Sequence, residues 1–247
     1  MPEAIIPQKT VELARSETYC AAVGIAEGIT SENTVGYATS ETLSAWGATM
    51  VTPQFITVAS TTGTFKLGEV RPVGDDVADT VTIQILNDDG TTDISRSYTW
   101  NGESWANDGS GTDATEVSII AGTGFWTYAN TDEDTTFQSA GEVNFSDVSF
   151  TLSPWGAIGV GNPFPVPRTL GDITPVGDDT SDTVTIQILN DDGTTDISRS
   201  YTWNGTAWVN DGNNTDASDV VIGAGVGMWV YSNSDEDAAL LIPAPTL

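Results

Sequence analysis

Residues 72–102 read PVGDDVADTVTIQILNDDGTTDISRSYTWNG, and residues 175–205 repeat this stretch as PVGDDTSDTVTIQILNDDGTTDISRSYTWNG. The two blocks agree at 29 of 31 positions, at a constant offset of 103 residues. Solenoid repeats recur about every 20 to 50 residues. This longer period therefore predicts that a whole small domain is present twice.

The block itself predicts strands joined by tight turns. In residues 80–86, TVTIQIL, apolar and polar positions alternate, which is typical of a half-buried strand. The NDDG sequence at 87–90 predicts a turn whose glycine takes a positive φ. The next strand is expected to carry Ile94, Arg96, Tyr98 and Trp100 on one face.

Additional strands are expected beyond the block. The Asn-Gly pair at 101–102 is a strong hairpin signal, and it leads to a strand that carries Trp105. Others are expected at 117–119 and 125–128, and neither copy shows a helical period. Short strands spaced by turns predict an all-β chain of two tandem, duplicated β-sandwich or barrel-like domains, with an N-terminal extension.

The duplication extends beyond the block and sets the domain boundaries. Residues 43–48, LSAWGA, match 152–157, LSPWGA, at an offset of 109. The first copy therefore has six extra residues between Phe55 and Leu67, which we expect in a surface loop at about 59–64. The predicted organisation is an N-terminal extension that can serve as an assembly arm (1–34), a first β-domain (35–140) and a second β-domain (141–247).

The charge of the chain is strongly acidic. Thirty-five acids face 7 bases, for a formal net charge of −28. Such a surface repels the phosphates of nucleic acids and anionic lipids, so we expect no nucleic-acid partner. The single cysteine, Cys20, allows no intrachain disulfide. No apolar stretch has the length of a membrane span, and the start MPEAIIPQK lacks the features of a signal peptide.

The usual catalytic residues are scarce. The chain has no histidine, and its two lysines are Lys9 and Lys66, of which the second aligns with Thr169. This composition excludes Ser-His and Cys-His nucleophile pairs, and it argues against a lysine-based mechanism shared by both copies. Hydrolysis by paired carboxylates stays open, but no acid stands out from the acidic background. We expect no enzymatic activity.

The acidic turns are candidate calcium sites, because calcium prefers oxygen ligands. The candidate ligands occupy the same turn in each copy: Asp88, Asp89, Asp93, Asp191, Asp192 and Asp196. This turn departs from the spacing of a calcium-binding loop, since Ile85 stands where the first carboxylate should be. Alternatively, aspartate and asparagine are present for local backbone reasons. No other cofactor is expected.

The eight tryptophans form four matched pairs, namely Trp46/Trp155, Trp100/Trp203, Trp105/Trp208 and Trp126/Trp229. Trp105 and Trp208 are candidates for stacking on a carbohydrate, because each follows a hairpin turn that can expose the ring. The alternative is core packing, because aromatic rings bury large areas in small sandwiches. The sequence is compatible with both carbohydrate stacking and core packing.

Residues 119–128, IIAGTGFWTY, resemble a pattern in β-rich modules of bacterial surface proteins, which carry I-P-A-G-x-G-F-W-V after a Tyr-Thr-Trp-Asn-Gly hairpin. The second copy is similar, with GAGVGMWV at 223–230. Such modules tend to carry Asn-Pro-Phe-Pro upstream; the second copy has it at 162–165, and the first keeps only Phe55. The resemblance covers about half of each copy. It implies an exported, non-catalytic β-sheet protein, although no signal peptide is visible.

Together these features predict a structural subunit of an extracellular or cell-surface assembly, such as a fibre or layer. We expect it to form a homo-oligomer or polymer through its terminal segments, residues 1–34 and the apolar end at 238–243. A head-to-tail relation of the two domains would repeat one contact and build an open filament. A carbohydrate-binding module and a phage virion component are the alternatives.

Overall fold

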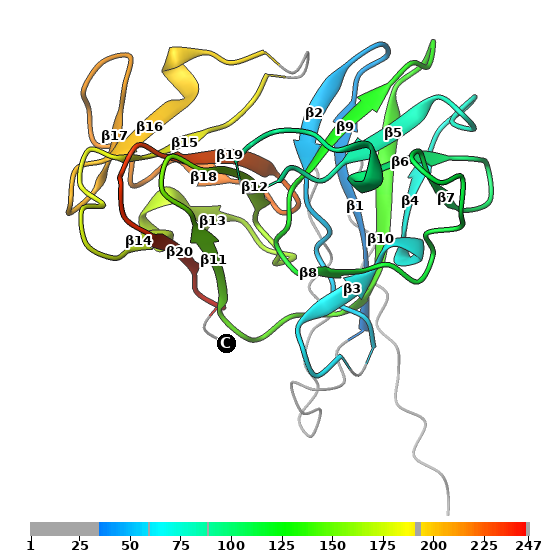
Figure 1. Cartoon of the computed structure of the whole chain (residues 1–247), viewed down its shortest axis with the longest axis horizontal. Helices are drawn as coiled ribbons and strands as arrows, with labels where there is room; N and C mark the ends of the chain where they lie inside the picture. Colours follow the sequence, from blue (N-terminus) through cyan, green and yellow to red (C-terminus); the bar gives the residue numbers. More distant parts are fainter. Residues whose placement is uncertain (1–34, 59, 88, 191–193, 246–247) are drawn as a thin grey trace, which may run out of the picture.

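The computed structural model describes residues 35–58, 60–87, 89–190 and 194–245. Within these ranges the chain is all-β, and its helical segments are four 3-10 turns: η2 (Leu67–Glu69), η3 (Ile94–Arg96), η4 (Leu170–Asp172) and η5 (Ile197–Arg199). Figure 1 shows two halves side by side, the first coloured blue to green and the second yellow-green to red. No helix in the described part is long and apolar enough to cross a membrane.

The first half contains β1 (Val35–Leu43), β2 (Ala48–Val51), β3 (Thr64–Lys66), β4 (Val70–Val73), β5 (Val81–Gln84), β6 (Ser97–Trp100), β7 (Trp105–Asn107), β8 (Ser118–Ile120), β9 (Phe125–Ala129) and β10 (Thr135–Glu142). The second half contains β11 (Val148–Leu152), β12 (Ala157–Gly161), β13 (Arg168–Thr169), β14 (Thr174–Val176), β15 (Val184–Gln187), β16 (Ser200–Trp203), β17 (Trp208–Asn210), β18 (Val221–Ile222), β19 (Gly227–Ser232) and β20 (Ala238–Ile242).

The two halves have the same topology. In the first, a three-stranded sheet β1-β10-β4 faces a five-stranded sheet β2-β9-β5-β6-β7, and β3 pairs with β8. In the second, the orders are β11-β20-β14, β12-β19-β15-β16-β17 and β13-β18. Each strand thus has its counterpart ten numbers later, and all ladders are antiparallel.

Each half is a β-sandwich with its own hydrophobic core. In the first half, Trp105 of the five-stranded sheet stacks on Phe137 of the three-stranded sheet, with ring centroids 6.4 Å apart and planes 6° apart. Its indole Nε1–H donates to the carbonyl of Val70 at 2.7 Å. In the second half, Trp208 donates in the same way to Ile173 at 2.8 Å. The inner faces of the two sheets therefore meet around a fully buried tryptophan in each half.

The alternating segment of the duplicated block confirms the predicted strand. In β5, Val81 and Ile83 are buried while Thr82 and Gln84 are half-buried. The following turn has Gly90 at φ +76°, as its glycine predicted, and the Asn-Gly turn joins β6 to β7 with Gly102 at φ +98°. The two predicted turn chemistries were therefore correct.

The predicted strand through Ile94 and Arg96 was wrong in its first part. Residues 94–96 form η3, and the strand begins only at Ser97. The reason is Asp93, whose carboxylate accepts from the backbone N–H of Ser95 at 2.8 Å and so caps a helical turn. Ile94 is consequently 65% exposed and does not share a face with the buried Tyr98.

The C-terminal apolar segment belongs to its own domain. β20 lies at the centre of a sheet, paired with β11 on one side and β14 on the other, and its Leu240 and Ile242 are fully buried. This segment is therefore paired on both edges within its own chain, whereas we had expected it to be available for strand exchange with a neighbouring copy. Residues 1–34, the other expected exchange segment, lie outside the described residues.

The predicted domain boundary after residue 140 falls inside β10, and the halves are joined by residues 143–147.

Candidate functional site

The two halves pack against each other through equivalent surfaces. Val51, at the end of β2, forms an antiparallel bridge to Val226, and Val160 of β12 forms one to Thr123. In the duplication, position 51 corresponds to 160 and position 123 to 226. The two bridges are therefore the same contact made from either side, which is the signature of an isologous, pseudo-twofold interface.

Backbone hydrogen bonds repeat this symmetry. The N–H of Thr52 donates to the carbonyl of Gly225 at 2.8 Å, and the N–H of Gly161 donates to the carbonyl of Gly122 at 2.9 Å. These bonds are again equivalent under the duplication. The two halves are thus not related head to tail, which was the condition expected for an open filament. An isologous contact closes on itself and does not propagate.

Glycines make this close approach possible. A Cβ on Gly227 would lie 2.5 Å from Cγ and 2.6 Å from the carbonyl carbon of Met50. A Cβ on Gly161 would lie 2.6 Å both from the Oγ1 of Thr52 and from the carbonyl oxygen of Val226. The glycines of the A-G-x-G segments, on which the resemblance to surface modules rested, are therefore packing residues of the interface between the halves.

The interface departs from symmetry at its centre. Met50 is 2% exposed, and the equivalent position in the second half is Gly159. Likewise, Thr52 corresponds to Gly161. At both positions the first half supplies a side chain, and the second half supplies the space that receives it. Two first halves would bring two bulky residues together, and two second halves would leave a void, so the pairing favours unlike halves.

A separate apolar cluster lies between the halves. It contains the equivalent pairs Leu86/Leu189 and Trp126/Trp229 together with Met50. The two indole rings meet edge-to-face, with centroids 6.0 Å apart and planes at 81°. The duplicated block also contributes, because Asp89 of its NDDG turn bridges to Ala157 of β12. The halves are thus joined by a buried core as well as by the linker.

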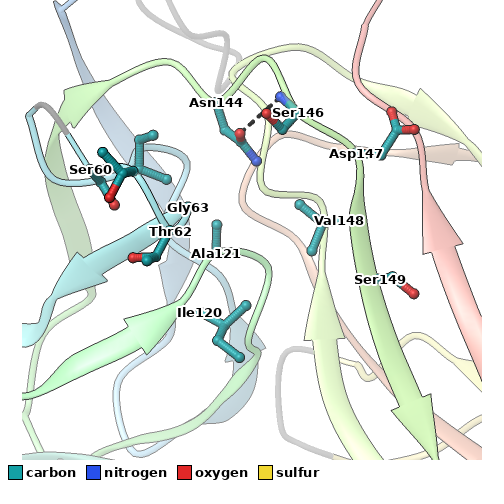
Figure 2. Close-up of a pocket in the computed structure, with 12 residues that line it drawn as sticks. Ser60, Thr62, Gly63, Ile120, Ala121, Asn144, Ser146, Asp147, Val148 and Ser149 are labelled. Atoms are coloured by element: carbon teal, nitrogen blue, oxygen red, sulfur yellow. Dashed lines mark hydrogen bonds between the residues drawn. The ribbon is translucent and has the colours of Figure 1, made fainter.

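A groove opens beside this interface, between the linker and the insertion of the first half. Figure 2 shows Ser60, Thr62 and Ile120 on one wall and Val148 and Ser149 on the other. The cavity has a volume of about 330 Å³. The segment 60–63 belongs to the six-residue insertion that was predicted from the sequence as a surface loop, so part of this insertion lines the junction of the two halves.

The lining of the groove consists of hydroxyl groups, an amide, an apolar strip and the carboxylate of Asp147, which accepts from the N–H of Ala244 at 2.8 Å. Asn144 is 3% exposed, and its side-chain oxygen accepts from the N–H of Ser146 at 3.0 Å. A second cavity of about 310 Å³ shares Ile120 and Ser149 with the first and reaches Arg96. The lining of the first cavity includes no Lys, Arg, His or Cys. The groove can therefore form hydrogen bonds through its hydroxyl, amide and carboxylate groups.

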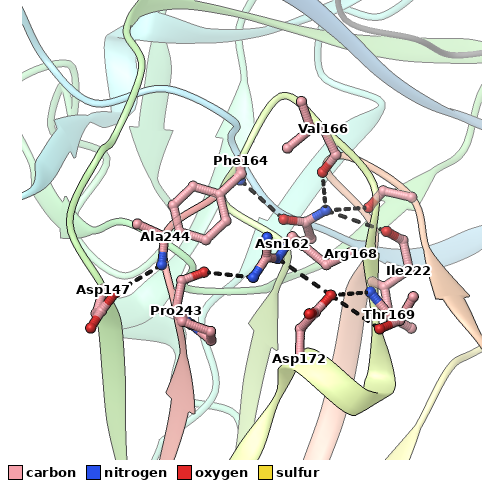
Figure 3. A network of polar contacts seen from close by, with 11 residues as sticks. Asp147, Asn162, Phe164, Val166, Arg168, Thr169, Asp172, Ile222, Pro243 and Ala244 are labelled. Atoms are coloured by element: carbon pink, nitrogen blue, oxygen red, sulfur yellow. Dashed lines mark hydrogen bonds and ion pairs between the residues drawn. The ribbon is translucent and has the colours of Figure 1, made fainter. Parts of the chain in front are cut away.

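The Asn-Pro-Phe-Pro segment has a structural role. Asn162 is fully buried, and its amide donates to the carbonyl of Val166 at 2.8 Å and accepts from the N–H of Phe164 at 3.1 Å (Figure 3). Arg168 donates to the carbonyl of Pro243 at 3.0 Å and lies over the ring of Phe164. This network holds the C-terminal strand against its domain.

Three of the six predicted calcium ligands are described, and each faces its own turn. Asp89 accepts from the N–H of Thr91 at 2.9 Å and from its hydroxyl, which lowers the pKa of the carboxyl. Asp93 and Asp196 cap η3 and η5, and the backbone N–H groups that they accept lower their pKa values.

Within the described residues, no three acidic, His or Cys side chains gather as a metal group would require. The remaining predicted ligands are Asp88, Asp191 and Asp192, which lie outside the described residues. The calcium site therefore stays a prediction.

The predicted stacking residues are in the core. Trp105 and Trp208 are both 0% exposed, so neither ring has a face for a sugar. The stacking interpretation is corrected to the core-packing alternative, because the rings fill the space between the two sheets. The most exposed tryptophans are Trp46 and Trp155, at 68% and 67%. A signal for them was present, because the Ser-Pro-Trp-Gly sequence at 153–156 is typical of a turn.

No protein-family model, curated protein or solved structure matches this chain. The site is therefore interpreted from its own geometry.

Proposed function

We propose that this protein is a non-catalytic structural subunit of an extracellular or cell-surface assembly, such as a fibre or layer. The observation that carries the proposal is the glycine-tight, pseudo-twofold interface between the halves. It makes the chain a unit that presents twice the outer surfaces that the two copies share. A subunit with two equivalent surfaces can link two neighbours, and its second contact benefits from a high effective concentration.

The assembly contacts are expected on the outer surfaces of the halves. The interface between the halves is closed, and β20 is paired on both sides, so neither offers a free contact. The surface charge also constrains assembly. With a net charge of −28, neighbouring copies repel one another, so the polymer should form more readily when salt or divalent cations screen the acids.

The test is light scattering and negative-stain electron microscopy of the purified chain. Protein concentration, salt and calcium should each be varied. We expect regular oligomers or filaments whose size grows with ionic strength. A chain that stays strictly monomeric over all of these conditions would refute self-assembly.

A carbohydrate-binding role is the second candidate, and the groove of Figure 2 supports it. Its hydroxyl groups, its amide and its apolar strip are groups that bind neutral sugars. A glycan array would test this role, with the six-residue insertion removed as the comparison. Binding that does not depend on the insertion would exclude the groove as the site.

A further inference from the structure

Two exposed tryptophans occupy equivalent turns in the two halves. Trp46 lies between β1 and β2, and Trp155 lies between β11 and β12. They are 68% and 67% exposed, which makes them the most exposed large apolar side chains of the described residues. A buried role in the fold cannot account for them.

The backbone at these positions is unfavourable for tryptophan. Trp46 has φ +56° and Trp155 has φ +53°. Each is the third residue of a turn that a backbone hydrogen bond closes. The N–H of Gly47 donates to the carbonyl of Ser44 at 2.8 Å, and the N–H of Gly156 donates to the carbonyl of Ser153 at 2.9 Å. This turn position favours glycine, and a bulky residue there costs stability. Both copies therefore keep an exposed ring where the fold alone would favour a residue without a side chain.

The loop after β9 holds the first tryptophan in place. The indole Nε1–H of Trp46 donates to Asp132 at 3.3 Å, and the N–H of Ala45 donates to Asp134 at 3.1 Å. In the second half, the N–H of Trp155 donates to the carbonyl of Ser234 at 3.0 Å, whose hydroxyl donates to Asp179 at 3.2 Å. Trp46 is thus anchored through its ring and Trp155 through its backbone, in both cases on a loop that carries carboxylates.

Valine side chains lie at the same end of each half. Leu43 pairs with Thr135, and Val73 pairs with Thr136, so the turn that carries Trp46 and the end of β4 flank the start of β10. Val73 is 36% exposed, and its counterpart Val176 is 51% exposed. The indole therefore shares its end of the domain with a second exposed apolar side chain.

The charge around each ring has one sign. Six exposed acids lie in the two neighbouring loops of each half: Asp75, Asp76, Asp79, Asp132, Glu133 and Asp134 in the first, and Asp178, Asp179, Asp182, Asp235, Glu236 and Asp237 in the second. The three loops at each end, 42–48, 74–79 and 130–134 and their counterparts 151–157, 177–182 and 233–237, contain no Lys or Arg. A ligand at this surface meets the negative face of an indole ring and a negative potential together.

We propose that Trp46 and Trp155 are the centres of two equivalent docking sites for cationic side chains of a basic partner protein. A guanidinium or ammonium group over the indole face gains a cation–π attraction, and the surrounding carboxylates attract it from a distance. A second copy of this chain does not fit, because it carries the same negative charge. The proposal goes beyond the assembly role, and either can fail alone.

The test uses the full chain and a 10-residue peptide of alternating glycine and arginine. Isothermal titration should show two peptides per chain at moderate salt. Trp46→Gly with Trp155→Gly removes both rings, suits the turn and leaves the net charge unchanged. We expect this variant to bind the peptide about 2- to 30-fold more weakly at each site. The variant with phenylalanine at both positions should lie between it and the unaltered protein.

Two controls separate the proposal from diffuse electrostatic attraction. Ile94→Ala with Ile197→Ala removes another exposed, matched pair, 65% exposed in each half, and should leave peptide binding unchanged. A glycine–glutamate peptide should not bind. Unchanged binding in the glycine variant would overturn the proposal, and so would ring-dependent binding of a neutral oligosaccharide in place of the peptide. Light scattering of the same variants reports on self-assembly separately.

Discussion

Substitution of Gly227 by alanine tests the interface between the halves directly. The new Cβ would lie 2.5 Å from Cγ, 2.6 Å from the carbonyl carbon and 2.7 Å from the carbonyl oxygen of Met50. Two of these three atoms are backbone, so a side-chain rotation cannot relieve the clash and β2 must move away from β19. Overpacking in a core costs about 1–3 kcal/mol. We expect a loss of about 3 kcal/mol in the free energy of unfolding, because backbone atoms are involved.

Urea unfolding followed by tryptophan fluorescence measures this loss. In a chain of this size, a change of that magnitude lowers the melting temperature by about 6–12 °C. The additional change Met50→Ala removes Cγ but leaves the two backbone contacts. The double variant should therefore lose at least about 0.5 kcal/mol less than the sum of the single variants.

Gly109→Ala is the matched control. It lies in an exposed turn, where the nearest atom would be 3.3 Å from the new Cβ, and it should change stability by less than about 0.5 kcal/mol. If Gly227→Ala were as stable as this control, or if its effect were additive with that of Met50→Ala, the described contact between β2 and β19 would be wrong.

Three further predictions follow from individual side chains. Trp46→Gly and Trp155→Gly should each raise the free energy of unfolding by about 0.5–1 kcal/mol, because a left-handed backbone costs a bulky residue about 1–2 kcal/mol. Thermal unfolding measures this gain, and a lower stability of either variant would contradict the reasoning. Trp105→Ala and Trp208→Ala should each cost about 3–5 kcal/mol in chemical unfolding, and a mild effect would speak against their place in the core. Because the pKa values of Asp93 and Asp196 lie below their usual 3.8, their stabilisation is present above about pH 4 and is lost as the pH falls through the folded-state pKa. The double variant Asp93→Asn with Asp196→Asn should therefore be less stable than the unaltered chain at pH 7. This difference in the free energy of unfolding should disappear in acid, and a difference that persists at low pH would show that the two carboxylate charges are not its cause.

Local sequence signals predicted the local structure well. The alternation in residues 80–86, the glycine at position 90 and the Asn-Gly hairpin all appear where expected, because each depends on residues that are near in sequence. The error at Ile94 is also local: an aspartate cap outweighed a strand-like alternation. Asp93, a residue type that often caps a helical turn, is the signal in the sequence for this 3-10 turn.

The role of the A-G-x-G segments could not be predicted from one copy. A glycine at position 227 is required only because Met50, 177 residues earlier, occupies the space above it. Nothing within residues 223–230 specifies that neighbour. The same holds for the buried Trp105 and the exposed Trp46, whose different environments depend on how the sheets close around them.

The asymmetry of the interface bears on how this chain can assemble. Two identical domains with an isologous contact would pair indiscriminately, between chains as well as within one. Met50 opposite Gly159 and Thr52 opposite Gly161 restrict the contact to one first half and one second half. The short linker, residues 143–147, keeps these two halves at a high effective concentration, so the contact closes within the chain. The proposed polymerisation must then use surfaces that this closure leaves free, and the acidic turns around Trp46 and Trp155 are not among them, because two copies of the chain repel each other there.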